Sequence, residues 1–446
     1  MTKRALLLPL AVVLVAPGLA VAQPAPDAKP TFVIGKFTTT LYGWLQGDFI
    51  HDTQRFTVDS YGGNPTLGLH GTQNGDMGRT VLSARSTRLG LRFAVPATES
   101  MKVSALFEMD FLGNQPGAPP RGSTTPSITE QAFLIQPTPR LRQAHFKLDT
   151  PYISLLVGQA WSLFGFQGSY LPTSVQNQGL PGQLFARNPQ FRLSRTFDTA
   201  PLSVEVAAAA VRSPQFDSEF PDLQGGLKLN VKSWTGLQNL GGTTTFVAPA
   251  SLAVAGLVRK VKLATSLTTN DTTTVTGSGI SVDALLPVIP AKERGGFALS
   301  LLGEFVNGTG ISDMFLALNG GVLIGQPAGI PAASYSPFQD VDFGLAAWTS
   351  AGDSLQTIDW RTMLVGAQLF YGPVILAANY SNVFSGNSYL FNGNTWTRQW
   401  FADGVVLVDV TSGVRLGAEF ARVVQARNTG AVANNSRFQF TGWFLF

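Results

Sequence analysis

The chain ends in SRFQFTGWFLF, residues Ser436 to Phe446, a stretch in which large apolar and polar side chains alternate. Side chains two residues apart lie on the same face of a β-strand. One face therefore carries phenylalanine at positions 438, 440, 444 and 446, and the other carries Arg437, Gln439, Thr441 and Trp443. Such a strand is stable only against hydrocarbon or in a covered core, and backbone groups in hydrocarbon must pair within a closed sheet. The stretch predicts the last strand of a barrel whose phenylalanines face lipid.

The composition of the whole chain also fits a membrane barrel. Only 13% of the 446 residues are charged, against roughly 25% in ordinary globular domains, and 11% are aromatic. After residue 22, no uninterrupted apolar run approaches the ~20 residues that a membrane helix needs. The sequence has no cysteine, so no disulfide framework is expected. The net charge of +4 is small and no basic helix occurs, so nucleic acid is not an expected partner.

The first 22 residues have the pattern of a secretory signal peptide. Two basic residues precede an apolar stretch that two prolines interrupt, and the segment ends in Ala-Val-Ala, a small-residue cleavage pattern. A membrane anchor is the alternative, which the short, proline-broken stretch disfavours. We therefore expect cleavage before Gln23, a short periplasmic segment over residues 23–36, and a barrel over residues 37–446.

Period-two patterning recurs along the rest of the chain, whereas sustained 3.6-residue patterns are absent. We therefore predict an all-β fold, a transmembrane antiparallel β-barrel of sixteen strands with long external loops. The expected strands cover residues 37–50, 80–95, 101–112, 139–149, 152–163, 190–197, 202–212, 222–231, 251–263, 277–288, 296–306, 359–371, 374–384, 399–410, 413–424 and 436–446.

Short and long connections alternate along most of the chain, as in outer-membrane barrels with tight periplasmic turns and long external loops. The shortest connections contain Thr-Pro, Ala-Pro, Gly-Pro and Ser-Gly pairs. The long ones cover residues 51–79, 113–138, 164–189, 307–358, 385–398 and 425–435. The connection over residues 232–250 is the exception, because its place in the alternation requires a short turn.

Several stretches together resemble the DcaP-like trimeric outer-membrane porins, a group of the Gram-negative porin superfamily associated with dicarboxylate uptake. They are LYGWLQGDFI (41–50), SARSTRLGLRF (83–93), LFEMDFLG (106–113), RLRQAHFKL (140–148), LLVGQAWSLF (155–164), ARNPQFRLSRTF (186–197) and the final three strands. Members of that group often carry a coiled-coil-prone helix before the barrel. Here QPAPDAKP occupies that place, and it is too rich in proline to form a helix.

The resemblance implies a water-filled channel for passive diffusion of small hydrophilic solutes, in the outer membrane of a Gram-negative bacterium. It implies that the loop over residues 164–189 folds into the lumen and narrows it, as the third long loop does in sixteen-stranded porins. It also implies a homotrimer in contact with outer-membrane lipid and lipopolysaccharide. The terminal Phe446 resembles the signal by which the barrel-assembly machinery recognises its substrates.

The candidate pore-lining residues are mainly arginines close in sequence to this loop. Residues 79–195 hold 12 basic and 5 acidic residues, an excess of seven, and the loop itself contains no acid. Strand parity directs the side chains of Arg88, Arg92 and Arg192 into the lumen. The same rule directs Glu108 and Asp110 inwards.

Three further arginines are candidates despite less favourable positions. Arg85 has the parity of the lipid face, so it requires a bulge or a position near the rim. Arg142 shares the parity of the apolar Phe146, and Arg187 lies in the predicted constriction loop. The full set of predicted selectivity residues is Arg85, Arg88, Arg92, Glu108, Asp110, Arg142, Arg187 and Arg192.

A ring of arginines attracts anions, and a guanidinium can bind a carboxylate through two parallel hydrogen bonds. We therefore predict a weak preference for anions such as dicarboxylates. The structural alternative is that the arginines pair with Glu108 and Asp110 and pin the barrel wall, or that they contact lipopolysaccharide or a neighbouring subunit. For the whole chain, the alternative is a barrel adhesin or surface scaffold with a plugged lumen, which the long 307–358 connection favours.

No enzyme is expected. The three histidines make no metal pair, and no nucleophile motif of the GxSxG type occurs. His145 and Ser154 flank one turn, but polar side chains on the lumen face are the commoner explanation for such a pair. The sequence predicts no catalytic, metal-binding or cofactor-binding residues.

Overall fold

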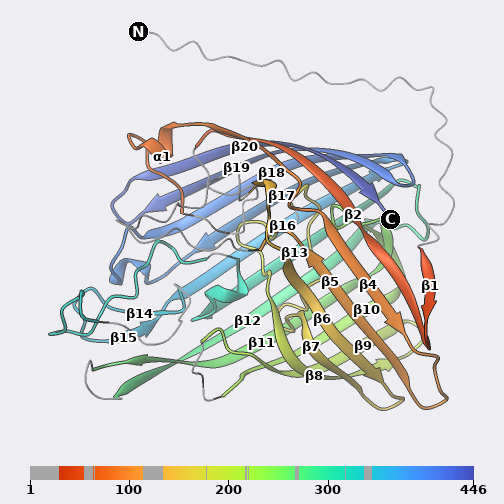
Figure 1. Ribbon diagram of the computed structural model, residues 1–446, viewed down its shortest axis with the longest axis horizontal. Coiled ribbons are helices and arrows are strands. Elements are labelled where there is room, and N and C mark those ends of the chain that lie inside the picture. Colours follow the sequence, from red (N-terminus) through yellow and green to blue (C-terminus); the bar gives the residue numbers. More distant parts are fainter. Residues whose placement is uncertain are drawn as a thin grey trace, which may run out of the picture.

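The computed structural model describes residues 30–54, 64, 66–113, 134–176, 178–215, 218, 220–266, 271–316, 318–335 and 344–446. Within these residues, sixteen antiparallel strands close into a barrel (Figure 1). The predicted signal peptide and the first half of the segment over 23–36, residues 23–29, lie outside the described residues. No described helix is both long and apolar enough to cross a bilayer.

Each of the sixteen predicted strands is present, and most extend beyond the predicted bounds. In chain order they are β2 Phe37–Asp52, β3 Arg79–Ser83 with β4 Arg88–Ala94, β5 Lys102–Asp110, β6 Arg140–Asp149, β7 Ser154–Trp161, β8 Arg187–Asp198, β9 Leu202–Val211, β10 Asp222–Gln238, β11 Phe246–Ala264, β12 Thr272–Ile289, β13 Ala298–Thr309, β16 Asp359–Tyr371, β17 Val374–Phe384, β18 Trp396–Thr411, β19 Val414–Arg427 and β20 Val432–Leu445. β3 and β4 count as one strand because both pair with β2.

A few short elements lie outside the sixteen strands. β1, Thr31–Ile34, forms a hairpin with the start of β2. In the loop between β13 and β16, β14 Ala346–Trp348 and β15 Leu355–Thr357 make a two-stranded sheet. The described helices are α1 Gln73–Asp76, η1 Ser312–Met314 and η2 Ser388–Leu390.

The last strand closes the barrel against the first, as its pattern predicts. β20 pairs with β2 from Asp52 opposite Arg437 to Trp44 opposite Leu445, and the backbone of Phe446 bonds to Gly43 in both directions. On the lumen side, Arg437 donates two hydrogen bonds to Asp52, at 2.9 and 2.8 Å. The seam is therefore held by backbone pairing and by a buried ion pair.

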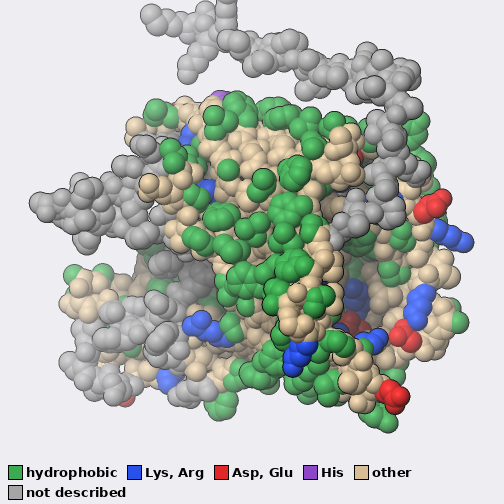
Figure 2. Space-filling model, turned by 45° about the vertical axis from the view of Figure 1, so that its right-hand side comes forward, with side chains coloured by type: hydrophobic (Ala, Val, Ile, Leu, Met, Phe, Trp, Pro, Cys, Tyr) green, Lys and Arg blue, Asp and Glu red, His purple; other side chains and the backbone are tan. Residues whose placement is uncertain are grey.

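The outer face of the barrel is apolar, as a bilayer requires. Phe438, Phe440 and Phe444 are 43%, 44% and 53% exposed, whereas Arg437 and Thr441, on the other face of β20, are buried. Figure 2 shows hydrophobic side chains over the middle of the barrel wall and charged side chains towards its edge. The chain is a transmembrane β-barrel with its polar side chains turned inwards.

Two β-bulges resolve the unfavourable parities of Arg85 and Arg142. Three residues of β2 (45–47) lie opposite four residues (84–87) between β3 and β4, so one extra residue shifts the parity there and turns Arg85 inwards. In β6, Arg142 is an extra residue, because Leu141 pairs with Met109 and Gln143 pairs with Glu108. Arg142 and Gln143 are consequently both buried on the lumen side.

The two ends of the barrel differ in their connections. At one end, which we call the short-turn end, lie Phe446 and tight turns such as 372–373 and 412–413; at the other, the long-loop end, lies the loop over 310–358 (Figure 1). The predicted long connection over 425–435 is wrong, because β19 and β20 extend through it and leave the turn 428–431. The 232–250 connection is mostly strand, since β10 and β11 continue pairing past a bulge to Gln238 and Phe246.

Candidate functional site

The loop between β7 and β8, residues 162–186, folds into the lumen and is buried over almost all of its described length. We call it the constriction loop; Asn177 lies outside the described residues. Leu163, Phe164, Val175 and Leu184 are all 1% exposed or less, so apolar packing holds the loop inside the barrel. This confirms the predicted inward fold. The boundary differs slightly, because Arg187 is the first residue of β8.

Polar side chains of β10, β13, β17 and β19 anchor the constriction loop to one side of the barrel. Glu419 accepts hydrogen bonds from Ser174 Oγ, Val175 N and Gln176 Nε2, at 2.6, 3.0 and 2.8 Å. The remaining anchors are Glu304 to Leu184 N, Gln224 to Ser162 Oγ and Phe164 N, and Asn379 to Thr173 O. The loop therefore covers the acids of this wall.

The opposite side of the lumen carries arginines from three strands. We call Arg88 and Arg92 of β4, Arg140 and Arg142 of β6, and Arg187 and Arg192 of β8 the basic wall. Their strands lie side by side in the sheet, since β4, β5, β6, β7 and β8 pair in that order. Side chains far apart in the sequence thus form one positively charged surface.

Two members of the basic wall are neutralised by acids of β5. Arg142 Nε lies 2.7 Å from Glu108 Oε1, and its Nη1 lies 3.0 Å from Asp110 Oδ2. Arg140 makes a two-pronged contact with Asp110, at 2.9 and 2.7 Å. Arg142, Glu108 and Asp110 are all buried. Arg140 and Arg142 therefore have the structural role given above as the alternative: they stabilise the barrel wall through buried ion pairs.

The other four members, Arg88, Arg92, Arg187 and Arg192, make no ion pair with any residue that the structure describes. Three of them stack on aromatic rings: Arg88 over Trp44 at 4.3 Å, Arg92 over Tyr42 at 4.2 Å, and Arg187 over Trp161 at 5.0 Å. Arg192 donates to Gln190 Oε1 at 3.0 Å and to Trp161 O. Stacking fixes a guanidinium plane and leaves N–H groups at its edge for an anion.

A cavity of about 840 Å³ lies between the basic wall and the constriction loop. Arg88, Arg92 and Arg142 line it from one side, and Gly168 and Leu171 of the constriction loop line it from the other. It continues towards the short-turn end, where the lining residues are Leu240, Gly242, Thr243, Thr244, Gly413 and Phe446. This cavity is the part of the lumen where a solute would meet the unpaired guanidiniums.

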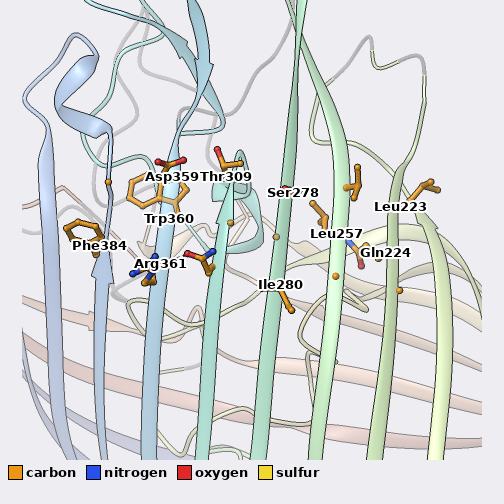
Figure 3. A pocket seen from close by; sticks show the side chains of 17 residues that line it. Leu223, Gln224, Leu257, Ser278, Ile280, Thr309, Asp359, Trp360, Arg361 and Phe384 are labelled. Atoms are coloured by element: carbon orange, nitrogen blue, oxygen red, sulfur yellow. Dashed lines mark hydrogen bonds between the residues drawn. The ribbon is translucent and has the colours of Figure 1, made fainter.

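A second cavity, of about 880 Å³, does not belong to the lumen (Figure 3). It lies on β10–β13, β16 and β17 and is lined by Leu223, Val258, Ile280 and Phe384, which are 61%, 54%, 46% and 44% exposed. Because exposed apolar side chains mark the outer face, this groove faces the bilayer. Arg361, which also lines it, is an outward-facing residue rather than a pore residue.

The structure brings most of the predicted site residues together. Arg88, Arg92, Glu108 and Arg142 line the lumen cavity directly. Asp110, Arg187 and Arg192 belong to the same wall, through the contacts given above. Arg85 lies apart from them, since its guanidinium donates to the backbone oxygens of Phe111 and Gly113, each at 3.4 Å. Arg85 therefore holds the long-loop end of β5.

Sequence reasoning missed the aromatic partners and the loop anchors. Tyr42 and Trp44 sit on the inward parity of β2, so period-two patterning was sufficient to find them. No local pattern marks Glu304 or Glu419 as anchors, because their partners lie more than 100 residues away in the sequence.

His145 and Ser154, the pair that flanks one turn, do not contact each other: His145 contacts Gln159 O and Ser154 donates to Asp149. In the described part of the chain, no cluster of three or more His, Asp or Glu could hold a metal.

Known proteins match this chain in structure but not in sequence. No protein-family model matches it, and no curated protein matches it. The outer-membrane channel DcaP of Acinetobacter baumannii superimposes with a TM-score of 0.63 over 93% of this chain and 99% of that one, at 16% identity. An anion-selective porin from Comamonas acidovorans matches with a TM-score of 0.48 and 11% identity, covering 92% and 100% of the two chains. Outer-membrane OmpT of Vibrio cholerae matches with a TM-score of 0.47 and 11% identity, covering 94% of this chain and 100% of that one. The chain therefore has the sixteen-stranded porin fold, in the form that the DcaP channel has.

Proposed function

We propose that this protein is an outer-membrane porin of the DcaP-like group, a water-filled channel through which small hydrophilic solutes diffuse passively. The channel prefers anions weakly, and carboxylates and dicarboxylates are the solutes that its chemistry favours. It has no enzymatic role. It resides in the outer membrane of a Gram-negative bacterium, to which the signal peptide over residues 1–22 directs it and in which Phe446 is the assembly signal.

One observation carries the anion preference: the charged residues that line the lumen cavity are mostly basic, since Arg88, Arg92 and Arg142 line it together with one acid, Glu108. On one side, four guanidiniums have no carboxylate partner among the described residues, and two of them line the cavity. On the other side, Glu304 and Glu419 are 4% and 2% exposed and are capped by the constriction loop. A solute in the cavity is therefore close to an excess of positive charge and is separated from Glu304 and Glu419 by protein.

We expect a wild-type channel with a chloride-to-potassium permeability ratio modestly above one. Arg140 and Arg142 are compensated by Glu108 and Asp110, which limits the ratio. Screening should reduce it further, because the Debye length falls from ~10 Å at 0.1 M to ~3 Å at 1 M salt. Reversal potentials across a KCl gradient in planar bilayers measure it. A channel that prefers K⁺ at both salt concentrations would contradict the proposed selectivity.

The same bilayers decide between a porin and a surface scaffold. The observation that favours a scaffold is the described part of the loop over 310–358, in which residues such as Phe315, Leu345 and Ile358 are 1% exposed or less. A scaffold with a plugged lumen inserts without conducting, whereas a porin shows discrete conductance steps. Insertion is checked separately by protection of the barrel from protease. An absence of conductance then indicates a plugged lumen rather than a failure to insert.

We also propose that the protein assembles as a homotrimer within outer-membrane lipid and lipopolysaccharide. The support is the exposed apolar surface of the first and last strands, where Leu45, Phe49 and Phe444 are 53%, 41% and 53% exposed. We expect a detergent-solubilised protein mass near three times that of one chain, which is 47.5 kDa before processing. Light scattering with correction for bound detergent measures this mass, and a value near one chain would exclude the trimer.

A further inference from the structure

The hairpin between β10 and β11 continues past the rim of the barrel at the short-turn end and bends into the barrel. A register shift between Val231 and Thr235 inserts three exposed residues (232–234) at the rim. Beyond this bulge the strands continue pairing until Gln238 lies opposite Phe246, and residues 239–245 form the tip. Leu237 is 1% exposed and Asn239 is fully buried, although both lie beyond the rim residues in sequence. The chain therefore turns back towards the lumen.

The tip spans the lumen to the far wall. Asn239 N donates to Gln368 Oε1 of β16 at 3.0 Å. Arg415 of β19 donates through Nη1 to the backbone oxygens of Gly241 and Thr243. Gly242 packs against the rings of Trp44 and Trp443, where an added Cβ would lie 3.0–3.2 Å from ring atoms. The tip thus contacts strands on the opposite side of the barrel from its own hairpin.

The contacts of Arg415 hold this tip in place. Its Nε and Nη2 bond to Asp409 at 2.6 and 3.1 Å, which fixes the guanidinium plane. The side chain is 1% exposed, so its remaining donors are directed at the two tip carbonyls rather than at water. Hydrogen bonds from a charged donor are stronger than bonds between neutral groups, so this contact holds the tip more firmly than a neutral side chain would.

The tip is also joined to the constriction loop. Gln238 Nε2 donates to Ser169 O at 2.9 Å, and Thr173 Oγ1 donates to Asn239 O at 2.8 Å. A Cβ at Gly241 would lie 2.4 Å from Ser174 O, so the two backbones touch there. The tip and the constriction loop therefore form one continuous obstruction, with the tip on the side of the short-turn end.

We propose that residues 239–245 form a second constriction of the channel, which limits the size of solutes at the short-turn end, and that Arg415 is its positioning residue. The inference deepens the proposed porin function and rests on it. Leu240, Gly242, Thr243 and Thr244 line the lumen cavity and carry no charge. The second constriction should consequently filter by size, whereas the basic wall sets charge preference. Conductance and selectivity then depend on different residues.

The hairpin geometry allows a clean test. Since Gln238 and Phe246 are directly paired, replacing residues 239–245 by Asn-Gly closes the hairpin with a two-residue turn. We expect the single-channel conductance to rise about twofold, because pore diameter limits ion flow. The reversal potential in a KCl gradient should stay at the wild-type value. Uptake of neutral sugars of increasing size into liposomes should extend to larger sugars.

A point substitution tests the same inference without altering the hairpin. Arg415→Ala frees the tip, so we expect higher and more variable conductance, and Arg415→Lys should restore part of the wild-type behaviour. Arg422→Ala is the control, since it removes the same charge from the outward face of β19. Because single-channel recordings count only inserted channels, lower yields of folded protein do not affect the readout.

The outcomes separate the two proposals. A wild-type protein that inserts and stays silent overturns the porin function and the second constriction together. A conducting wild type, with both the shortened hairpin and Arg415→Ala at wild-type conductance, overturns the second constriction alone. In the shortened hairpin, whose removed residues carry no charge, a rise in conductance that is accompanied by a shift in reversal potential also overturns it. If the shortened protein does not insert, the Arg415 variants decide.

Discussion

Replacing Arg88, Arg92 and Arg192 together by glutamine should shift the channel from anion preference towards cations at low salt. These guanidiniums make no ion pair with any described residue. Their charges therefore act on a passing ion with only the longer-range compensation of nearby acids, such as Glu108 beside Arg88 and Glu205 beside Arg192. A unit charge ~6 Å from an ion in water contributes about 0.7 kcal/mol before screening. For three charges we expect the chloride-to-potassium permeability ratio to fall about three- to tenfold at 0.1 M salt, and by less than about twofold at 1 M.

The measurement is the reversal potential across a KCl gradient at both salt concentrations. The control replaces Arg195, Lys260 and Arg361 by glutamine, which removes the same net charge from outward-facing positions. Glutamine keeps a polar stem at each position, so conductance should change little. If the triple substitution leaves the reversal potential of the wild type unchanged, the unpaired arginines do not set selectivity, and the supposed match to carboxylates has no physical basis.

The strands were predictable because alternation is enforced wherever a strand crosses the middle of the bilayer. A residue on the lipid face that is charged costs roughly 2–4 kcal/mol at mid-membrane, so the sequence must carry the pattern in each strand. This is why all sixteen strands, the lipid-facing phenylalanines of β20 and the inward Glu108 and Asp110 could be assigned. The same pattern explains why Arg85 and Arg142 were difficult to assign to a face of the barrel. Arg85 and Arg142 break the pattern, and each lies at a bulge, where one added residue reverses parity.

The interior of the lumen was less predictable, because its contacts join residues that are distant in the sequence. Glu419 and Ser174 are 245 residues apart, and no local pattern pairs them. The inward path of residues 239–245 depends on Arg415 and Gln368, which have no sequence signature as clamps. Which arginines are compensated was also undetermined, since Arg140 and Arg142 compete with Arg88 for the same acids. Strand pairing alone does not decide this, because Asp110 lies opposite Arg88 on β4 and opposite Arg140 on β6. The side-chain contacts decide it, since Asp110 bonds to Arg140 and Arg142.

Asp110→Ala should destabilise the barrel more than any surface ion-pair substitution. Asp110 is fully buried and accepts hydrogen bonds from Arg140, Arg142 and the backbone N–H of Leu112. Removing one partner of a buried pair leaves an uncompensated charge and costs about 3–5 kcal/mol. The free energy of unfolding by guanidinium chloride in detergent micelles, followed by tryptophan fluorescence, measures this loss. The matched control is Asp149→Ala, whose partner Lys147 is 41% exposed, and exposed pairs contribute about 1 kcal/mol or less.

A second substitution separates the loss of pairing from the loss of packing. In the Asp110→Ala background, Arg140→Ala removes a guanidinium that has lost its only carboxylate in the described structure, while Arg142 keeps Glu108. The double variant should therefore recover part of the lost stability, which a pure packing defect would not allow. Selectivity supplies an independent readout. With Asp110 gone, Arg140 becomes a further uncompensated charge, so the single variant should prefer chloride more strongly than the wild type, and the double variant should return towards it. Wild-type stability in Asp110→Ala, or an unchanged reversal potential in a destabilised Asp110→Ala channel, would show that the acids of β5 do not balance the basic wall.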